Sequence, residues 1–309
     1  MTFNAESTTN DVLKGVDLTG KCILVTGASA GLGVETIRAL QAHGATVVGA
    51  ARDLVKAQRA LREANVNDIA LVEVDLASLA SVRKAADGVV AKGQKFDVII
   101  GNAGVMACPQ GKTTDGFETQ FGTNHLGHFV FINRLLPLLK SPGRVVMLSS
   151  SGHRICDVDL ADPNFEKTPY TPWMAYGRAK TANALYAVGL DARLKARGVR
   201  ATAVHPGGIQ TELGRHLTPE SIQELMAMRG PDAPKFKSVP QGAATSVWCA
   251  VVAPADAVGG RFCEDCQVAA VNDNERPRVG VRSYALDVKH ADALWEKSEA
   301  MVGETFALQ

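Results

Sequence analysis

The 309-residue sequence predicts one α/β domain, a doubly wound parallel sheet of about seven strands with helices on both faces. From residue 21 to residue 205, short apolar or β-branched runs alternate with amphipathic stretches long enough to form right-handed crossover helices. This alternation is typical of a parallel sheet that is covered on both faces. No linker, internal repeat or low-complexity tract divides the chain, so a single domain is expected.

The elements follow from the same pattern. The expected strands cover residues 22–26, 46–50, 69–74, 98–100, 144–148 and 200–205, with a seventh near 261–263. The expected helices lie near residues 32–43, 53–63, 78–91, 117–139, 172–197, 241–252 and 292–302. Residues 1–19 are interpreted as a polar N-terminal extension. Residues 207–240 are rich in Gly and Pro and hold a short helix with Thr218 as its cap and Pro219 in its first turn. Because this segment follows the sixth strand, it is expected to form a substrate lid at the carboxyl ends of the strands.

The composition excludes several classes of protein. Lysine and arginine number 33 against 32 aspartates and glutamates, which argues against the basic surface of a nucleic-acid-binding protein. No run of about 18 apolar residues is long enough to span a membrane, and the polar start lacks the apolar core of a secretory signal. Six scattered cysteines are too few for a disulfide scaffold. We therefore expect a cytoplasmic protein with no membrane anchor and no nucleic-acid partner.

A turn rich in small residues follows the first expected strand. Residues 26–33 read TGASAGLG, with GxxxGxG spacing at the start of a helix. Small side chains let backbone N–H groups approach a pyrophosphate at the positive end of that helix, so a Rossmann-type dinucleotide site is expected. The alternative is a glycine turn that only packs the helix on the strand, but the strand–turn–helix context favours the nucleotide site. The expected cofactor contacts are Gly27, Ser29, Ala30, Gly31, Leu32 and Gly33.

The second expected strand ends without a carboxylate. A site that prefers NAD needs an acidic residue there to bind the ribose 2′-hydroxyl. Here Arg52 follows the strand, and its guanidinium can bind the 2′-phosphate of NADP; an ordinary surface arginine is the alternative. Asp53 suits the N-cap of the next helix. The sequence thus favours NADP(H) over NAD(H). Asp75, after the third strand, is assigned either to the adenine amino group or to the cap of helix 78–91.

Residues suited to proton transfer lie on the helix expected at 172–197. Tyr176 and Lys180 are four residues apart, so their side chains share one face of this helix. This spacing is common in helices and carries little weight by itself. Three further motifs each close an expected strand: Asn-Ala-Gly at 102–104, three serines at 149–151 and His-Pro-Gly at 205–207. Since the carboxyl ends of parallel strands meet at one edge, the combination predicts an active site beside the nucleotide.

Together these motifs resemble the short-chain dehydrogenase/reductase family. The resemblance runs in order from about residue 21 to 211, through TGASAGLG, the aspartate of VDLAS, NAG, the asparagine of NHLGHF, SSS, YGRAK and HPG. LASLASVR at 76–83 and NHLGHF at 124–129 are most similar to the branch that contains retinol dehydrogenases and protochlorophyllide reductases. The resemblance implies a catalytic tetrad of Asn124, Ser150, Tyr176 and Lys180, with Ser150 chosen because His153 stands three residues after it.

These residue types suit the chemistry of such a site. Hydride exchange at a carbon bearing oxygen needs a proton donor or acceptor beside that oxygen, the role assigned to Tyr176. The charge of Lys180 favours the phenolate and its amine is placed at the nicotinamide ribose, while Ser150 donates to the substrate oxygen. Asn124 either anchors a water that links Lys180 to solvent or bonds the backbone within the sheet. The remaining expected cofactor contacts are Leu76, Asn102, Ala103, Gly104, Tyr176, Lys180, Pro206, Gly207, Ile209 and Thr211.

The resemblance implies an NADP(H)-dependent dehydrogenase or reductase acting on the alcohol/carbonyl pair of a lipophilic small molecule. A C=C reductase of the same family and a catalytically silent NAD(P)-binding regulator are the alternatives. The protein is expected to be a homodimer or homotetramer. Phe165, Trp173 and the residues around 213–228 are candidates for the substrate pocket. No metal is expected, because the CxxC pair at Cys263 and Cys266 has no further ligands beside it.

Overall fold

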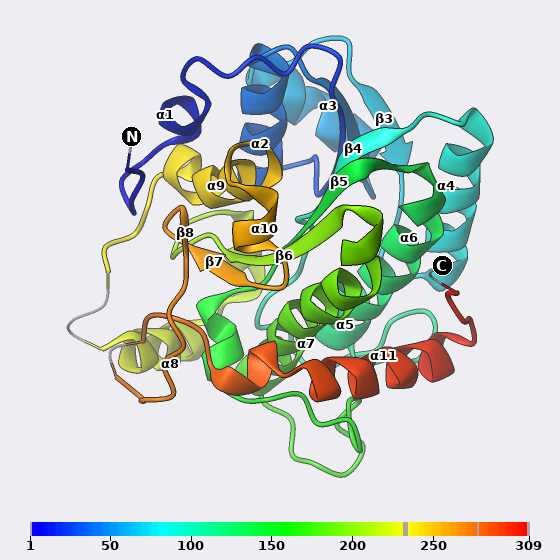
Figure 1. The fold of residues 1–309 in the computed structure, drawn as a ribbon. Helices are drawn as coiled ribbons and strands as arrows, with labels where there is room; N and C mark the ends of the chain where they lie inside the picture. The colour runs from blue at the N-terminus through cyan, green and yellow to red at the C-terminus, as the bar shows by residue number, and fades with distance from the viewer. Residues whose placement is uncertain (1, 231–233, 277, 308–309) are drawn as a thin grey trace.

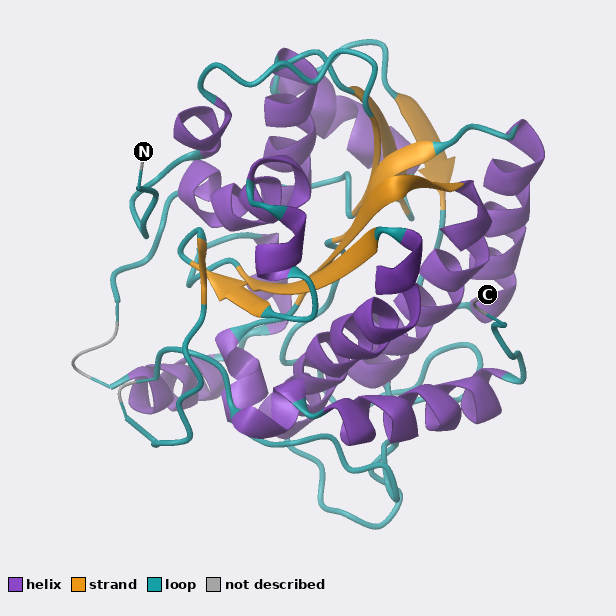
Figure 2. Cartoon of the chain, in the orientation of Figure 1, coloured by secondary structure: helices purple, strands orange, loops and turns teal. Residues whose placement is uncertain are grey.

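The computed structural model describes residues 2–230, 234–276 and 278–307. Within these residues one sheet contains eight strands: β1 (Cys22–Thr26), β2 (Thr46–Ala51), β3 (Ala70–Glu73), β4 (Phe96–Gly101), β5 (Leu139–Leu148), β6 (Val199–His205), β7 (Phe262–Glu264) and β8 (Gln267–Val268). Their order is β3-β2-β1-β4-β5-β6-β7-β8, and helices cover both faces (Figure 1, Figure 2). Neighbours pair in parallel except β7 and β8, which are antiparallel.

This order confirms the predicted doubly wound sheet. The chain runs outward from β1 to β3, then returns to pair β4 with β1 and continues outward to β7. The reversal creates a topological switch point between β1 and β4, where α/β sheets bind ligands beyond the carboxyl ends of the strands. The strand that the sequence did not reveal is β8. Asp265 and Cys266, at φ of 53° and 56°, form the tight turn that folds β8 back on β7, so the CxxC pair belongs to a hairpin.

Two apolar layers hold the helices on the sheet. The helices are α1 (Thr9–Leu13), α2 (Gly31–Ala42), α3 (Leu54–Glu63), α4 (Leu79–Lys92), α5 (Thr119–Phe121), α6 (Gly127–Leu135), α7 (Pro172–Leu194), α8 (Pro219–Arg229), α9 (Val239–Val247), α10 (Ala255–Val258) and α11 (Val288–Val302). Successive residues of β1 point to opposite faces, as a pleated strand requires. Leu24 packs in the layer with α4, α6, α7 and α11. Ile23 and Val25 pack in the layer with α1, α2, α3 and α9.

The helix predicted over 117–139 is present at residues 119–138, but its hydrogen-bond pattern changes along its length. The segment is divided into α5, a π-helical turn at Gly122–Leu126, α6 and a 3₁₀ turn at Leu136–Leu138. Pro137 has no N–H to donate to a helix, and β5 begins at Leu139, five residues earlier than expected. The π turn carries Asn124, so the irregular stretch lies where the sequence placed a functional residue.

The two ends of the chain are more ordered than the sequence pattern indicated. Residues 9–13 of the expected polar extension form α1, which Thr8 and Asp11 begin with a reciprocal capping box. Val12 and Leu13 of α1 are buried in the layer with α2. At the other end, Asp287 caps α11, which therefore begins before the expected residue 292. Across the three described ranges, no helix combines the length and the apolar character needed to cross a bilayer.

Candidate active site

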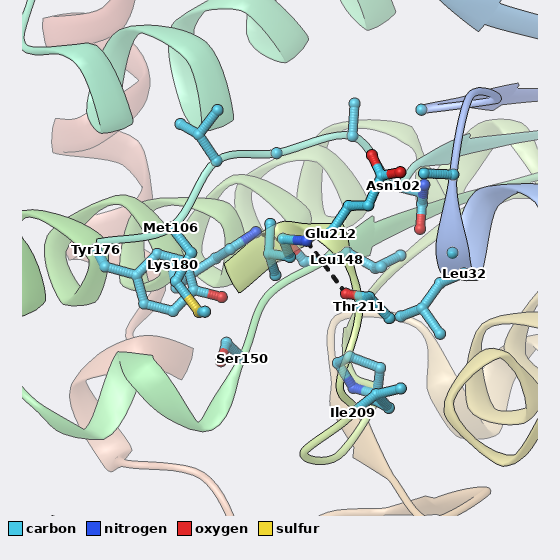
Figure 3. Close-up of a pocket in the computed structure, with 18 of the residues that line it drawn as sticks. Leu32, Asn102, Met106, Leu148, Ser150, Tyr176, Lys180, Ile209, Thr211 and Glu212 are labelled. Atoms are coloured by element: carbon cyan, nitrogen blue, oxygen red, sulfur yellow. Dashed lines mark hydrogen bonds between the residues drawn. The ribbon is translucent and has the colours of Figure 1, made fainter. Parts of the chain in front are cut away.

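A cavity of about 510 Å³ opens at the carboxyl ends of the strands. Its walls come from the segments that follow β1, β2, β3, β4, β5 and β6 in turn. Most of the predicted site residues line it: Gly27, Ser29, Ala30, Gly31, Leu32, Arg52, Asp75, Leu76, Asn102, Ala103, Gly104, Ser150, Tyr176, Lys180, Pro206, Gly207, Ile209 and Thr211. Gly33 and Asn124 lie outside the lining. Figure 3 shows Tyr176 and Lys180 together at one end, with Leu32 and Asn102 at the other.

The turn after β1 is shaped by close backbone approach. Gly27 has φ of 80°, and a Cβ there would lie 2.6 Å from Nδ2 of Asn102. A Cβ on Gly33 would overlap the carbonyl oxygen of Gly27, so this glycine packs α2 on the turn without reaching the cavity. Ala30 occupies the N-cap of α2 but offers no side-chain acceptor to the first N–H groups of the helix. These donors stand at the positive end of α2, beside cavity-lining residues.

A buried hydrogen-bond network joins the ends of β1 and β4. The Thr26 hydroxyl accepts from the backbone N–H of Asn102 at 2.9 Å and of Ala103 at 3.0 Å, and Asn102 Nδ2 donates to the Thr26 carbonyl. Thr26 Oγ1 lies 2.9 Å from Nε2 of His128, whose Nδ1 donates to the Asn124 carbonyl. Burial lowers the pKa of His128 to about 4, so the ring is neutral at pH 7 and Nε2 accepts from Thr26. The sequence motif contained Asn102 but gave no sign of this network.

Charged side chains mark the end of the cavity next to β2. Arg52 is exposed at the cavity wall, and Asp53 caps α3 as predicted, accepting from the Lys56 N–H at 2.9 Å. Lys56 Nζ forms an ion pair with Glu212, which belongs to the segment after β6. Asp75 does not cap α4, because Ser78 does so. The Asp75 Oδ1 atom accepts from the Ala77 N–H at 3.0 Å, and the residue lines the cavity.

At the opposite end, α7 and the turn after β5 bring three predicted residues together. Tyr176 and Lys180 lie on one face of α7, and the Lys180 Nζ is 5.7 Å from the centre of the Tyr176 ring. Lys180 Nζ donates to the Leu148 carbonyl at 3.0 Å, which fixes the ammonium beneath the end of β5. Ser150 caps the short turn at Ser151–Arg154. Gly152 allows the Tyr176 ring to pack against that turn, since a Cβ there would lie 2.7 Å from Cε1 of the ring.

Burial dominates the acid–base properties of this group. It raises the pKa of Tyr176 to about 12, although a hydrogen bond with Ser150 acts in the opposite direction. Burial lowers the pKa of Lys180 to about 8. At pH 7 the phenol is therefore protonated and the amine is charged. The sequence led us to expect only that the charge of Lys180 favours the phenolate. In the structure burial is the largest influence on the pKa of Tyr176, because the phenol lies out of water and the ammonium is bonded to Leu148.

The side chain of Asn124 is held by the backbone. Its Oδ1 accepts from the Val105 N–H at 2.8 Å, and its Nδ2 donates to the Val105 carbonyl at 2.9 Å. This matches the alternative in which Asn124 bonds the backbone. The residue still lies beside the catalytic group, because a Cβ on Gly104 would be 3.0 Å from Asn124 Oδ1 and 3.7 Å from Lys180 Nζ.

Beyond Tyr176 the cavity has an apolar wall. It is lined by Trp173, Leu213, Leu225 and Met228, which are among the residues that the sequence suggested for a substrate pocket. Further apolar lining residues that the sequence did not reveal are Met106, Ile155 and Phe236. Phe165 lies outside the lining and packs under the guanidinium of Arg178, 4.0 Å from its ring centre. Three arginines also reach this part of the cavity, and the sequence gave no signal for them: Arg215, Arg229 and Arg278.

Comparisons with known proteins agree with the motifs. The sequence model of the short chain dehydrogenase family matches residues 21–221. Among curated proteins, the short-chain dehydrogenase/reductase prx1 of Penicillium roqueforti is 39% identical, covering 97% of this chain and 91% of the relative. Retinol dehydrogenase 12 of Mus musculus is 38% identical, covering 93% of this chain and 88% of the relative.

Solved structures share the fold. A crystal structure of an uncharacterized protein from Mycobacterium paratuberculosis matches with a TM-score of 0.75 and 35% identity, over 98% of this chain and all of the other. A short chain dehydrogenase from Burkholderia cenocepacia, solved in complex with NADP, matches with a TM-score of 0.63 and 23% identity, over 80% of this chain and 96% of the other.

Proposed function

Because this chain belongs to the short-chain dehydrogenase family, as its motifs indicated, we propose that it moves a hydride between NADP(H) and an alcohol/carbonyl pair, with Tyr176 as general acid and base. One observation carries the proposal. Ser150, Tyr176 and Lys180 meet at one end of a cavity whose other end is the glycine turn at the start of α2. A nicotinamide dinucleotide that extends between these two ends would bring its reactive ring to the phenol.

The residues present fit the cofactor. The N–H groups of the uncapped first turn of α2 suit a pyrophosphate, and small residues there leave room for it. Pro206, Gly207, Ile209 and Thr211 line the cavity between the two ends and would contact the diphosphate and the nicotinamide carboxamide. Asp75, beyond β3, lines the cavity and would accept from the adenine amino group. When bound, the cofactor supplies or accepts the hydride.

The chain's own residues manage the proton. In carbonyl reduction, the protonated Tyr176 gives its hydroxyl proton to the substrate oxygen, which becomes the alcohol. The Ser150 hydroxyl donates a hydrogen bond to the same oxygen as negative charge develops on it. Lys180, charged at pH 7, stabilises the phenolate that remains. Asn124 is proposed as a positioning residue, since it holds the Val105 backbone next to Gly104 and Lys180.

The preference for NADP(H) rests on Arg52. It lines the cavity directly after β2, where an NAD-preferring site would carry a carboxylate. The described side chain makes no ion pair, so its guanidinium is accessible to a 2′-phosphate. Residues 207–230 and 234–240 would act as the substrate lid, and the apolar wall beneath α8 suits a lipophilic substrate body. Retinol dehydrogenases among the relatives support that choice.

The proposal is tested with purified protein, NADPH and a panel of aldehydes and ketones. We expect the protein to consume NADPH, monitored by nicotinamide absorbance, and the Tyr176→Phe variant to lose about 10²–10⁴-fold in kcat. NADPH binding by Tyr176→Phe, measured by fluorescence titration, should stay close to that of the wild type. Cofactor binding without turnover of any compound would instead identify a silent NAD(P)-binding regulator. Full activity of the variant would remove Tyr176 from the mechanism.

A further inference from the structure

Charge is divided unevenly along the cavity. The carboxylates that line it are Asp53, Asp75 and Glu212, at the end next to β2 or in an ion pair with Lys56. The apolar end beyond Tyr176 has instead the three arginines that the sequence did not reveal. Among the residues that the structure describes, no carboxylate side chain forms an ion pair with Arg215, Arg229 or Arg278. The substrate end of the cavity is therefore positively charged.

Arg278 is the arginine with the least compensation. Its side chain is partly buried, and both burial and the like charges of Arg282 and Arg276 lower its pKa. A guanidinium stays charged at neutral pH, so these unfavourable interactions are carried by the folded protein. An anion bound at Arg278 would offset both the lost hydration and the repulsion. The surroundings of Arg278 therefore favour the binding of an anion.

A buried arginine side chain binds the backbone of the segment that carries Arg278. Arg154 follows the Ser150 turn and donates to the carbonyl of Asn274 at 2.6 Å, of Asn272 at 2.9 Å and of Val279 at 3.0 Å. These bonds fix the backbone on both sides of Arg278. The guanidinium is thus presented to the cavity from an anchored segment, which lowers the entropy lost when it binds a ligand.

Arg229, at the end of α8, extends the positive surface from the lid. Its guanidinium stacks on the ring of Phe236, 4.3 Å from the centre, and donates to the Pro234 carbonyl. A Cβ on Gly208 would lie 2.6 Å from its Nη1, so the guanidinium lies over the loop that follows β6. Arg215 lies on the same lid segment and donates to the Glu212 carbonyl at 3.2 Å. At this end of the cavity, the apolar lining residues therefore lie beside the guanidinium groups of Arg215, Arg229 and Arg278.

We propose that the substrate carries a carboxylate at the far end of an apolar chain, and that Arg278, assisted by Arg229, binds it. The inference rests on the proposed function, because it concerns the molecule whose carbonyl meets Tyr176. Met106, Ile155, Trp173 and Met228 contact the apolar body. The guanidinium fork matches the two oxygens of a carboxylate, which a neutral alcohol or ester does not offer.

The experiment compares ω-oxo carboxylic acids of graded chain length with their methyl esters. The two series share the aldehyde and the apolar chain and differ in the charge. We expect kcat/KM with NADPH to favour the acid by about tenfold or more at the best length, the effect of one charge-assisted hydrogen bond. Arg278→Gln should abolish the preference, so that the variant has the same kcat/KM for the acid as for the ester, and Arg278→Lys should keep part of it. Arg261→Gln, an exposed arginine outside the cavity lining, is the matched control and should behave as wild type.

Two results would overturn the inference while leaving the proposed function intact. One is equal kcat/KM for acid and ester at every length. The other is a rise in KM for NADPH in Arg278→Gln with both substrates, which would place Arg278 at the cofactor. If no aldehyde is reduced, the proposed function fails, and calorimetry on the NADPH-loaded protein with α,ω-dicarboxylic acids and their diesters decides the inference. Binding of the diacid that Arg278→Gln weakens about tenfold or more supports it; equal binding of diacid and diester rejects it.

Discussion

The two ends of the cavity are built by different means. At the glycine turn, the groups that face the cavity are backbone N–H donors at the start of α2 and residues directly after β1 and β4. Beyond Tyr176, the wall combines side chains of α8 and its flanking segments with Met106, Ile155 and Trp173, which come from the segments after β4 and β5 and from α7. The first end is fixed by the sheet, since strand pairing and the Thr26 network leave the turn little freedom. The second end depends on which side chains the lid presents.

This difference indicates how the chain divides its tasks. A backbone-built site binds a group that is common to many reactions, and its geometry follows from the fold. A side-chain-built site is specific, because each substitution changes shape or charge without disturbing the sheet. Variants at the catalytic group and the cofactor end should therefore affect turnover of every substrate, whereas variants in the lid should change which substrate is preferred.

After Tyr176→Phe, the largest effect is expected at Lys180, which lies beside Tyr176 on α7. Lys180→Met removes the charge that stabilises the phenolate, and kcat/KM should fall about 10²-fold or more with every carbonyl. In the wild type, the Lys180 ammonium is present below its pKa of about 8 and is lost above it. The reduction rate should therefore decline as the pH rises through about 8, and this decline should be absent from the pH profile of Lys180→Met.

The buried histidines do not interfere with that measurement. The pKa of His128 and of His153 is lowered to about 4, and that of His205 to about 3, so these rings stay neutral across the range. A decline near pH 8 that persists in Lys180→Met would assign the titration to another group and would weaken the proposed role of the lysine.

An intermediate effect is expected at Arg52. Arg52→Gln removes the guanidinium proposed to bind the 2′-phosphate, and kcat/KM for NADPH should fall about tenfold while that for NADH stays the same. Steady-state rates with both cofactors and one aldehyde measure the ratio. Arg62→Gln, a change on α3 outside the cavity lining, controls for the loss of one positive charge. An unchanged ratio would mean that Arg52 is an ordinary surface residue.

The smallest effect is expected at the ion pair between Lys56 and Glu212, which joins α3 to the lid. Both side chains are partly exposed to solvent, so Glu212→Gln should change the free energy of unfolding by about 0–1 kcal/mol. Denaturant unfolding of Glu212→Gln, Lys56→Met and the double variant gives the coupling between the two groups. A coupling free energy well above that range would mean that the ion pair fixes the lid to α3, so that the lid end would not be independent of the sheet end.

The sequence predicted the cavity residues at the strand ends better than those of the apolar wall beyond Tyr176, for a physical reason. Strand ends in a parallel sheet share one edge, so motifs at residues 102–104, 149–151 and 205–207 could be brought together before any contact was known. The π turn within the helix predicted over 117–139 was not expected, because such a turn keeps the apolar period of a helix while it inserts one residue. The helix α1 is too short to show an apolar period, but its capping pair, Thr8 and Asp11, is a pattern that indicates the start of a helix.

Arg278 illustrates what sequence patterns leave undetermined. It lies in an irregular segment more than one hundred residues from Tyr176, and its place at the cavity depends on the bonds of Arg154 to backbone carbonyls. Neither periodicity nor a motif encodes such a contact. The pKa of Tyr176 belongs to the same class, since burial is the largest cause of its rise and the spacing of Tyr176 and Lys180 does not reveal burial.

The contacts of Arg154 also bear on how the substrate preference of this chain can change. Its guanidinium donates to backbone carbonyls of the segment around Arg278, so these bonds do not depend on which side chains the segment carries. In such a chain, the residues that contact the substrate can be substituted while the backbone that positions them is retained. Substrate preference can then drift or be redesigned at Arg278 itself, with the proton-transfer group and its neighbouring turn left as they are.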